Sequence, residues 1–416
     1  DSKKWYELTA TDCQTSREPD NVANCPYMTK LIKKCQLTSG REVLFWTDDA
    51  SKTANGGAVS DAEFEDYRAA VCSGSGDKQG FDKLVGLTGD FWLASPRYRQ
   101  NIAGDGDRSL SAYNNSLQPF NVIFVKPPNG TGWGGYVWSL NASTKATGGA
   151  YVNSNEALLT FINSTMSNSS SGVNYTKSTL IHEVQHALSY ASATQRGGYG
   201  TATALEEGQA VTSEDIVTPT MVQGYNKITI GSTSRLANYL KTDGGVSWAD
   251  WPSLSGDHYN MAGAWGAFQN RMVGTKAFKS AANDCARYTE TVGRSTVAFS
   301  NCYEQAIQSE GALSFADFFG RLGASVFGNL GTQNLPPWIG FPAQAINSND
   351  RPHGFSFPAV DLTSLSSELT GSSNISNFDM TTHYYKRFNI SGTSLTRTGI
   401  KIPPKSSLFI VIRDEQ

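Results

Sequence analysis

The sequence has little charge and no excess of either sign. Charged residues make up 17% of the 416 residues, and 34 basic against 37 acidic side chains leave a net charge of −3. This balance argues against nucleic-acid binding, which needs a basic face to neutralise phosphates. No apolar run approaches about 18 residues, so we expect no membrane span. Because 11% of the residues are aromatic, the chain can form a packed interior and is expected to be globular.

Cysteine is also scarce, and its spacing excludes the usual metal and redox patterns. The six cysteines lie at positions 13, 25, 35, 72, 285 and 302, and none forms a C-x-x-C pair. We expect bridges within the N-terminal region and a local Cys285–Cys302 bridge, with buried free thiols in a cytosolic protein as the alternative. The chain begins at Asp1 without an apolar leader and is rich in Gly, Ser, Thr and Asn. We therefore expect a secreted mature chain.

Local patterns predict strands first, helices next and strands again at the end. A helix is expected from Ser60, because Glu63 follows at the capping-box spacing. Strands are expected at Val43–Thr47, Asn121–Val125, Gly135–Leu140 and Gly149–Asn153. Helices are expected at 155–166, 177–193, 203–217, 234–241, 257–273, 299–309 and 314–327. Alternating segments at Gly354–Pro358, Tyr384–Ile390, Leu395–Ile402 and Leu408–Ile412 predict a small antiparallel β unit.

The most informative motif is HEVQH at residues 182–186, an HExxH sequence. On a helix, His182 and His186 project from the same face, so both imidazoles can bind one metal ion. Glu183 can reach a water at that ion without being a ligand. The alternative, that the two histidines only pack against neighbours, is weaker because the pair uses two of only five histidines.

The third ligand separates the subtypes of HExxH protein. A metzincin would need Gly at 189 and His at 192, and both residues are serine. The remaining common arrangement adds a glutamate from a following helix. Glu206 and Glu207 are candidates, 20 and 21 residues beyond His186. Only one can face the metal, since adjacent helical residues point about 100° apart.

These motifs resemble a known family. HEVQHALSY followed by ALEEGQA is similar to the HExxH and LNEGxA motifs of gluzincin metallopeptidases, most closely the hyicolysin (M30) family. The resemblance covers roughly residues 41–330. It implies a Zn²⁺ ion held by His182, His186 and Glu207. It also implies that Tyr259, in HYNMAGAW, donates a hydrogen bond to the developing oxyanion, with His258 as the substitute.

Other titratable residues have weaker patterns. Glu214 lies seven residues after Glu207 and can hold the free N–H of a ligand histidine, with a solvated charge as a nearly equal alternative, as for Asp215. Asp105-Gly106-Asp107 has calcium-loop chemistry but not the EF-hand pattern, so we interpret it as a turn. His353 and His383 are interpreted as surface or packing residues.

Together these patterns predict an α+β fold built as a gluzincin-type catalytic domain with an appended C-terminal antiparallel β unit. Residues 1–40 are expected to form a disulfide-bearing segment and 346–416 the β domain. The catalytic domain is expected at 41–345. Its first part, 41–193, holds a small mixed or antiparallel sheet and the active-site helix, and 194–345 forms a helical subdomain.

The expected function is a secreted zinc endopeptidase that cleaves protein or peptide substrates, with Glu183 as general base and Tyr259 as a second catalytic residue. No aminopeptidase GxMEN element is present. Two alternatives stay open, namely a zinc aminopeptidase and a secreted binding or adhesion protein with an inactive zinc site. The sequence leaves the oligomeric state open, and we expect a monomer.

Overall fold

The structure is a computed structural model with an α+β fold, as predicted. It divides into two compact units, residues 1–201 with 217–225 and 286–290, and residues 202–216 with 226–285 and 291–416. The residues that it describes are 1–22, 25–72, 79–89, 118–128, 132–142, 152–195, 203–242, 244–248, 251, 253–285, 295–312, 314–328, 330–332, 335–345, 355–368, 383, 385 and 408–411.

A six-stranded mixed sheet forms the centre of the first unit. Its order is β1-β2-β3-β4-β6-β5. The inner pairs β3–β4 and β4–β6 are parallel, and the outer pairs are antiparallel. The strands are β1 (Ser2–Tyr6), β2 (Pro26–Gln36), β3 (Glu42–Asp48), β4 (Phe120–Val125), β5 (Gly135–Tyr136) and β6 (Leu158–Asn163).

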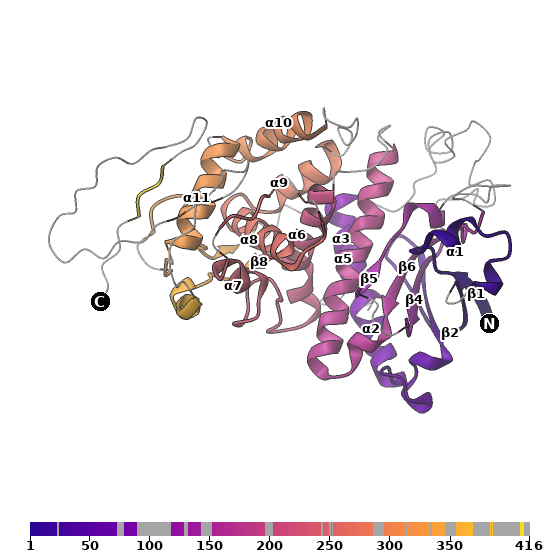
Figure 1. Ribbon diagram of the computed structural model, residues 1–416. Helices are drawn as coiled ribbons and strands as arrows, with labels where there is room; N and C mark the ends of the chain where they lie inside the picture. Colours follow the sequence, from indigo (N-terminus) through magenta and orange to yellow (C-terminus); the bar gives the residue numbers. More distant parts are fainter. Residues whose placement is uncertain are drawn as a thin grey trace. The chain divides into compact units, whose positions relative to one another are not determined.

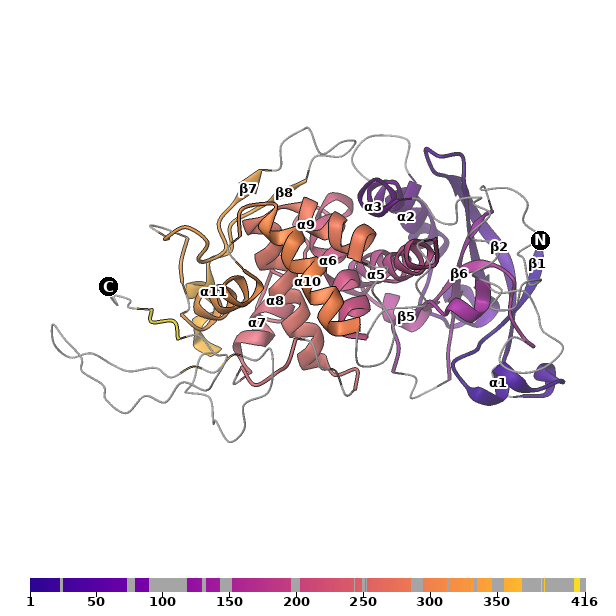
Figure 2. The same cartoon turned by 90° about the horizontal axis from the view of Figure 1, so that it is seen from above.

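Three helices cover one face of this sheet (Figures 1 and 2). They are α2 (Asp61–Cys72), α3 (Gly80–Thr88) and the long α5 (Ser170–Gln195), whereas the short α1 (Thr11–Thr15) follows β1. Aromatic rings join helices to sheet, since Tyr67 stacks on Phe124 at 5.1 Å and Phe81 meets Phe120 edge-on at 5.8 Å. The predicted capping box is present, because Ser60 and Glu63 bond reciprocally at the start of α2.

The alternate residues of the strands form a second core on the other face. Its buried members are Trp5, Trp46, Ile123, Val125, Ala157, Leu159 and Phe161. The indole of Trp46 donates to the Asn121 side-chain oxygen at 2.9 Å, which satisfies both polar groups inside the core. Because β4 and β6 are buried on both faces, their sequences are mainly apolar and do not alternate.

The burial of β6 on both faces hides its strand character in the sequence. Residues 155–166 were expected to be helical, but Leu158–Asn163 is a fully buried central strand followed by a 3₁₀ turn at Ser164–Ser167. A continuous apolar run fits both a buried helix and a buried strand, so periodicity does not separate them. The strand expected at Gly135–Leu140 is shorter, ending at Tyr136. Of the strand expected at Gly149–Asn153, residues 149–151 lie outside the described residues, and Val152 and Asn153 form a turn.

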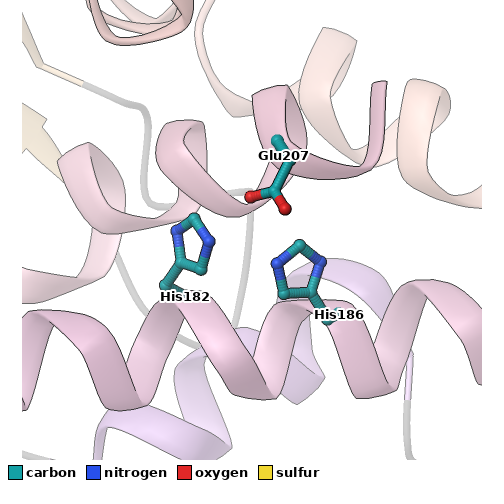
Figure 3. Close-up of side chains that lie close together, drawn as sticks. All are labelled: His182, His186 and Glu207. Carbon is teal, nitrogen blue, oxygen red and sulfur yellow. The ribbon is translucent and has the colours of Figure 1, made fainter. Parts of the chain in front are cut away.

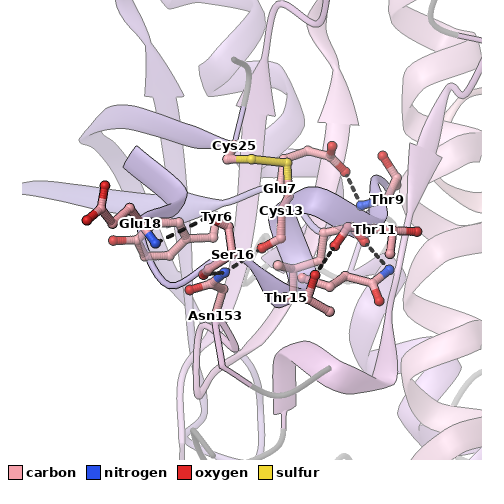
Figure 4. The surroundings of a disulfide bond; sticks show 12 residues. Tyr6, Glu7, Thr9, Thr11, Cys13, Thr15, Ser16, Glu18, Cys25 and Asn153 are labelled. Carbon is pink, nitrogen blue, oxygen red and sulfur yellow. Dashed lines mark hydrogen bonds between the residues drawn. A yellow bond between two sulfur atoms is a disulfide. The ribbon is translucent and has the colours of Figure 1, made fainter. Parts of the chain in front are cut away.

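All six cysteines form disulfides, between Cys13 and Cys25, Cys35 and Cys72, and Cys285 and Cys302. The expected local pairing is therefore confirmed, and the free-thiol alternative is wrong. The first bridge is tied to the sheet-bearing unit by Asn153, whose side-chain amide donates to the carbonyls of Cys13 and Ser16 at 2.6 and 2.9 Å (Figure 4). The second joins β2 to the end of α2.

The second unit is mainly helical, and serine N-caps define several helix starts. Ser234, Ser255 and Ser314 each accept a hydrogen bond from the first turn, at α7, α8 and α11. Rings around Trp265, including Trp248, form the core of this unit. The helices are α6 (Thr203–Met221), whose end belongs to the first unit, α7 (Arg235–Leu240), α8 (Gly256–Met272), α9 (Thr275–Ser280), α10 (Ser295–Gln308) and α11 (Phe315–Phe327).

Near the C-terminus, β7 (Gln344–Ala345) pairs antiparallel with β8 (Ser356–Phe357). The second strand lies within the expected segment Gly354–Pro358. Residues 408–411 of the expected strand Leu408–Ile412 are not in a strand, although Phe409 packs onto α11 at Gly320. The expected segment Leu395–Ile402, and all of Tyr384–Ile390 except Tyr385, lie outside the described residues.

His383 is a buried packing residue of the second unit, in line with its interpretation from the sequence. Its Nδ1 lies 2.9 Å from the Tyr239 hydroxyl, its Nε2 lies 2.7 Å from the Phe319 carbonyl, and its ring stacks on Phe319 at 4.1 Å. Gly323 leaves room for the imidazole, since a Cβ there would lie 2.4 Å from it. Burial lowers the pKa of His383 to about 4.

The unfolding free energy should therefore depend on pH through His383. Below its ordinary pKa of about 6.5, the unfolded chain takes up a proton that the folded chain refuses, so stability falls as the pH drops toward 4 and then levels. A shift of this size corresponds to about 3 kcal/mol. We expect urea unfolding of the metal-free His383→Gln variant to lose less stability than wild type between pH 7 and pH 4. An identical pH dependence in the two proteins would contradict this reading.

Candidate metal centre

Helix α5 carries the HExxH motif in its buried middle. The flanking residues Leu180, Ile181, Val184 and Leu188 are enclosed. The helix packs against β5, β6, α2 and α3, so its apolar side faces the sheet-bearing core. His182 and Glu183 are themselves only 7% and 5% exposed. These polar side chains therefore lie in the middle of a helix whose position is fixed by the burial of its apolar residues.

His182 and His186 lie one helical turn apart on the same side of α5. Their ring centroids are 4.8 Å apart and their planes stand at 82°. His186 is half-buried, so it is more exposed to solvent than His182. Side chains at i and i+4 share a helix face, and this backbone relation brings the two rings together.

Glu207, on the first half of α6, completes a group of three potential ligands (Figure 3). One ligand atom from each of His182, His186 and Glu207 lies within 4.8 Å of the others. The carboxylate in Figure 3 points toward the two imidazoles, which project from the helix opposite. Among the residues that the structure describes, this is the group of histidine, cysteine and acidic side chains that can hold a metal ion.

The donor set fits zinc. Two imidazole nitrogens and one carboxylate oxygen, with a fourth position left for water or substrate, are typical of catalytic zinc sites. Tetrahedral zinc bonds of about 2.1 Å place ligand atoms roughly 3.4 Å apart, so each pair here is at most roughly 1.4 Å wider than one ion requires. The residues present therefore fit the metal that the motif implies.

The two adjacent glutamates of α6 are not equivalent in this arrangement. Both are half-buried, but the group that the structure brings together contains Glu207 and not Glu206. The residue spacing alone left this choice open, and the resemblance to the M30 motif indicated Glu207. That Glu207 is a ligand and Glu206 is not stays a prediction, which the variants described below test.

Two further acidic side chains of α6, those of Asp215 and Glu214, are buried and paired. Asp215 is 1% exposed and accepts hydrogen bonds from Asn226 at 2.8 Å and Asn270 at 2.9 Å, with Arg271 at 3.1 Å. Glu214 is fully buried and forms an ion pair with Lys227. The interpretation of either residue as a solvated charge is wrong. These partners lie up to 56 positions away in the chain, so no local sequence signal identifies them.

Tyr259 and His258 begin α8 and share contacts with Trp251. The Tyr259 ring meets Trp251 edge-on at 5.5 Å and lies under the Arg235 guanidinium at 4.9 Å. His258 stacks on Trp251 at 5.1 Å, and its Nδ1 lies 2.7 Å from the hydroxyl of the N-cap Ser255. The group of candidate metal ligands includes neither residue. The role of Tyr259 therefore stays a prediction.

Two weaker sequence features fall elsewhere. Asp105-Gly106-Asp107, interpreted above as a turn, and His353 lie outside the described residues. Within the described part of the chain, no helix is sufficiently long and apolar to cross a bilayer.

Two histidines one turn apart on a buried helix, joined by a glutamate from the next long helix, form the metal-binding arrangement of HExxH metallopeptidases. The sequence profile of the family Peptidase M30 matches residues 23–413, nearly the whole chain. The chain therefore belongs to the M30, or hyicolysin, family of peptidases, as its motifs indicated. Membership implies a metal and a protein substrate. No curated protein matches the chain.

Substitution of the two neighbouring glutamates tests the ligand assignment. We expect Glu207→Gln to lower zinc affinity by at least about 100-fold, because a charged ligand is lost, and Glu206→Gln to bind zinc as wild type does. Zinc content after dialysis and competition with a chromogenic chelator measure the difference without an activity assay. Loss of zinc in Glu206→Gln alone would move the ligand role to that residue.

Proposed function

We propose that this protein is a secreted zinc-dependent endopeptidase that hydrolyses peptide bonds of protein substrates. The proposal is carried by the convergence of His182, His186 and Glu207 in a chain of the M30 family. These three residues hold the ion, and Glu183 is the general base. Bound zinc supplies a Lewis acid that acidifies water and polarises a peptide carbonyl.

Glu183 is suited to proton transfer by its position on α5. It follows His182 directly and is 5% exposed, so its carboxylate is held beside the ligand face but away from bulk water. In the proposed reaction Glu183 takes the proton of the attacking water and later passes it to the leaving amine. A carboxylate fixed by a buried helix needs little reorganisation for this step.

Tyr259 is the proposed donor to the oxyanion. Its phenol can give a hydrogen bond that forms fully only in the transition state, and removing one such donor commonly lowers turnover by roughly 100-fold or more. The Tyr259 ring is held by its contacts with Trp251 and Arg235. His258, the alternative, is engaged by Ser255 through Nδ1.

The edge strand β5 is the proposed main-chain site for an extended substrate. It pairs with β6 on one side and ends the described order of the sheet on the other. The strand expected at Gly149–Asn153 does not offer such an edge, because the described part of that segment is a turn. An added strand bonds through its backbone, which suits cleavage inside a chain.

Two other functions make different demands. An aminopeptidase needs a site that anchors a free amino terminus, and the sequence has no GxMEN element for it. A binding or adhesion protein would not need a general base, whereas Glu183 is retained beside a complete ligand set. Secretion is supported by the three disulfides, which persist in oxidising compartments.

Peptide hydrolysis by wild type and Glu183→Gln tests the proposed chemistry. We expect wild type to cleave casein and N-acetylated peptides internally, and saturating phenanthroline to abolish the activity. Glu183→Gln should keep its zinc and thermal stability but lose several orders of magnitude in kcat, because the amide does not accept the proton. Hydrolysis that survives phenanthroline would contradict the zinc mechanism. Cleavage restricted to free amino termini would indicate the aminopeptidase instead.

The Tyr259→Phe variant tests the oxyanion donor. Its ring keeps the contacts with Trp251 and Arg235, so folding should be unaffected. We expect kcat to fall roughly 100-fold with little change in KM. His258→Gln is the control and should retain turnover near that of wild type. The reverse pattern, with only the His258 variant impaired, would transfer the role to His258.

A further inference from the structure

Gly135 of the edge strand lies directly against the Glu183 side chain. A Cβ placed on Gly135 would be 2.8 Å from Glu183 Cγ, 3.1 Å from Glu183 Oε1 and 3.1 Å from Ile162 Cδ1. Carbon atoms in proteins do not approach as closely as the first of these distances. A side chain at position 135 would therefore fit only if the Glu183 side chain or the edge strand moved.

Both neighbours of Gly135 are enclosed by the surrounding structure. Glu183 is 5% exposed on a helix whose flanking residues are enclosed. Ile162 is fully buried in β6, and its backbone faces Gly135 in the antiparallel register. Close-packed interiors transmit such a displacement instead of absorbing it. An added methyl group at position 135 would push the Glu183 carboxylate, the edge strand or both.

The adjacent Gly134 provides a natural comparison. A Cβ there would meet Thr179, Tyr175 and Met166 at 3.8 to 3.9 Å, which is ordinary van der Waals contact. Neither glycine is among those with a positive φ, so backbone strain does not distinguish the two positions. The two glycines therefore differ in the close approach of the Glu183 and Ile162 side chains to Gly135.

We propose that Gly135 is a positioning residue for the general base, because the lack of a side chain there determines where the Glu183 carboxylate lies relative to the proposed metal ligands of α5. This inference rests on the proposed function, because it concerns the same site. Catalytic groups must be held to within about 0.5 Å of their productive position. A displacement of about 1 Å commonly costs roughly 100-fold in rate. Because Gly135 has no side chain, it leaves the space that the Glu183 side chain occupies, and the general base can stay in its productive position.

The test compares Gly135→Ala with Gly134→Ala in the full-length protein. We expect kcat of Gly135→Ala to fall roughly 10- to 100-fold, with KM within about twofold of wild type. Zinc content should match wild type, any loss of Tm should be small enough to leave the protein folded at the assay temperature, and Gly134→Ala should behave as wild type throughout. An unchanged kcat in Gly135→Ala, or a loss confined to KM, would overturn the proposal.

A second variant separates the two crowded neighbours. Ile162→Val removes the Cδ1 atom, so Gly135→Ala in that background conflicts with Glu183 alone. If the loss persists in the double variant, the Glu183 contact is its cause, and if turnover recovers, distortion of the sheet is the cause and the proposal fails. The same background provides room for folding if the single variant is unstable.

A crystal structure of metal-free Gly135→Ala gives a readout independent of activity. We expect the Glu183 carboxylate to be displaced relative to wild type while α5 keeps its position. An unmoved carboxylate would contradict the inference. If wild type shows no peptide hydrolysis, the proposed function fails, yet this measurement still decides whether Gly135 positions Glu183.

Discussion

Burial of α5 against the mixed sheet is the constraint on which the site depends. Apolar residues on both sides of the motif hold the helix, and they carry His182 and Glu183 with them into a poorly hydrated position. Removing a carboxylate from water is unfavourable unless a cation or hydrogen bonds compensate. The divalent ion proposed at His182, His186 and Glu207 would provide such compensation, and it would then link metal binding to the packing of α5.

Much of this organisation could be predicted from local sequence patterns. Helices with serine caps and mixed polar and apolar faces were located nearly to the residue, as at Ser234 and Ser314. The HExxH motif was equally readable, since its chemistry depends on positions four apart on one helix. The failure at Leu158–Asn163 has the opposite cause. A strand enclosed on both faces loses the alternation that identifies strands, so only its pairing with β4 and β5 reveals it.

Other parts of the site depend on contacts between distant positions and had no local signal. The requirement for a small residue at position 135 arises from Glu183, which lies 48 residues later in the chain. A single glycine within a Gly-rich stretch does not indicate such a requirement. The buried partners of Asp215 are likewise brought together only by the packing of helices. The choice between Glu206 and Glu207 needed a family motif, because helical geometry allows either residue to face a neighbour.

The connectivity of the disulfides has a consequence for biosynthesis. The six cysteines pair two by two in sequence order, first with second, third with fourth and fifth with sixth, with separations of 12, 37 and 17 residues. In the secreted protein proposed above, every bridge could form in an oxidising compartment as soon as its second thiol emerges, before any later cysteine is available to compete. With this pairing order the native disulfides could form without isomerisation of mispaired ones, so oxidation could proceed while the chain is still being synthesised.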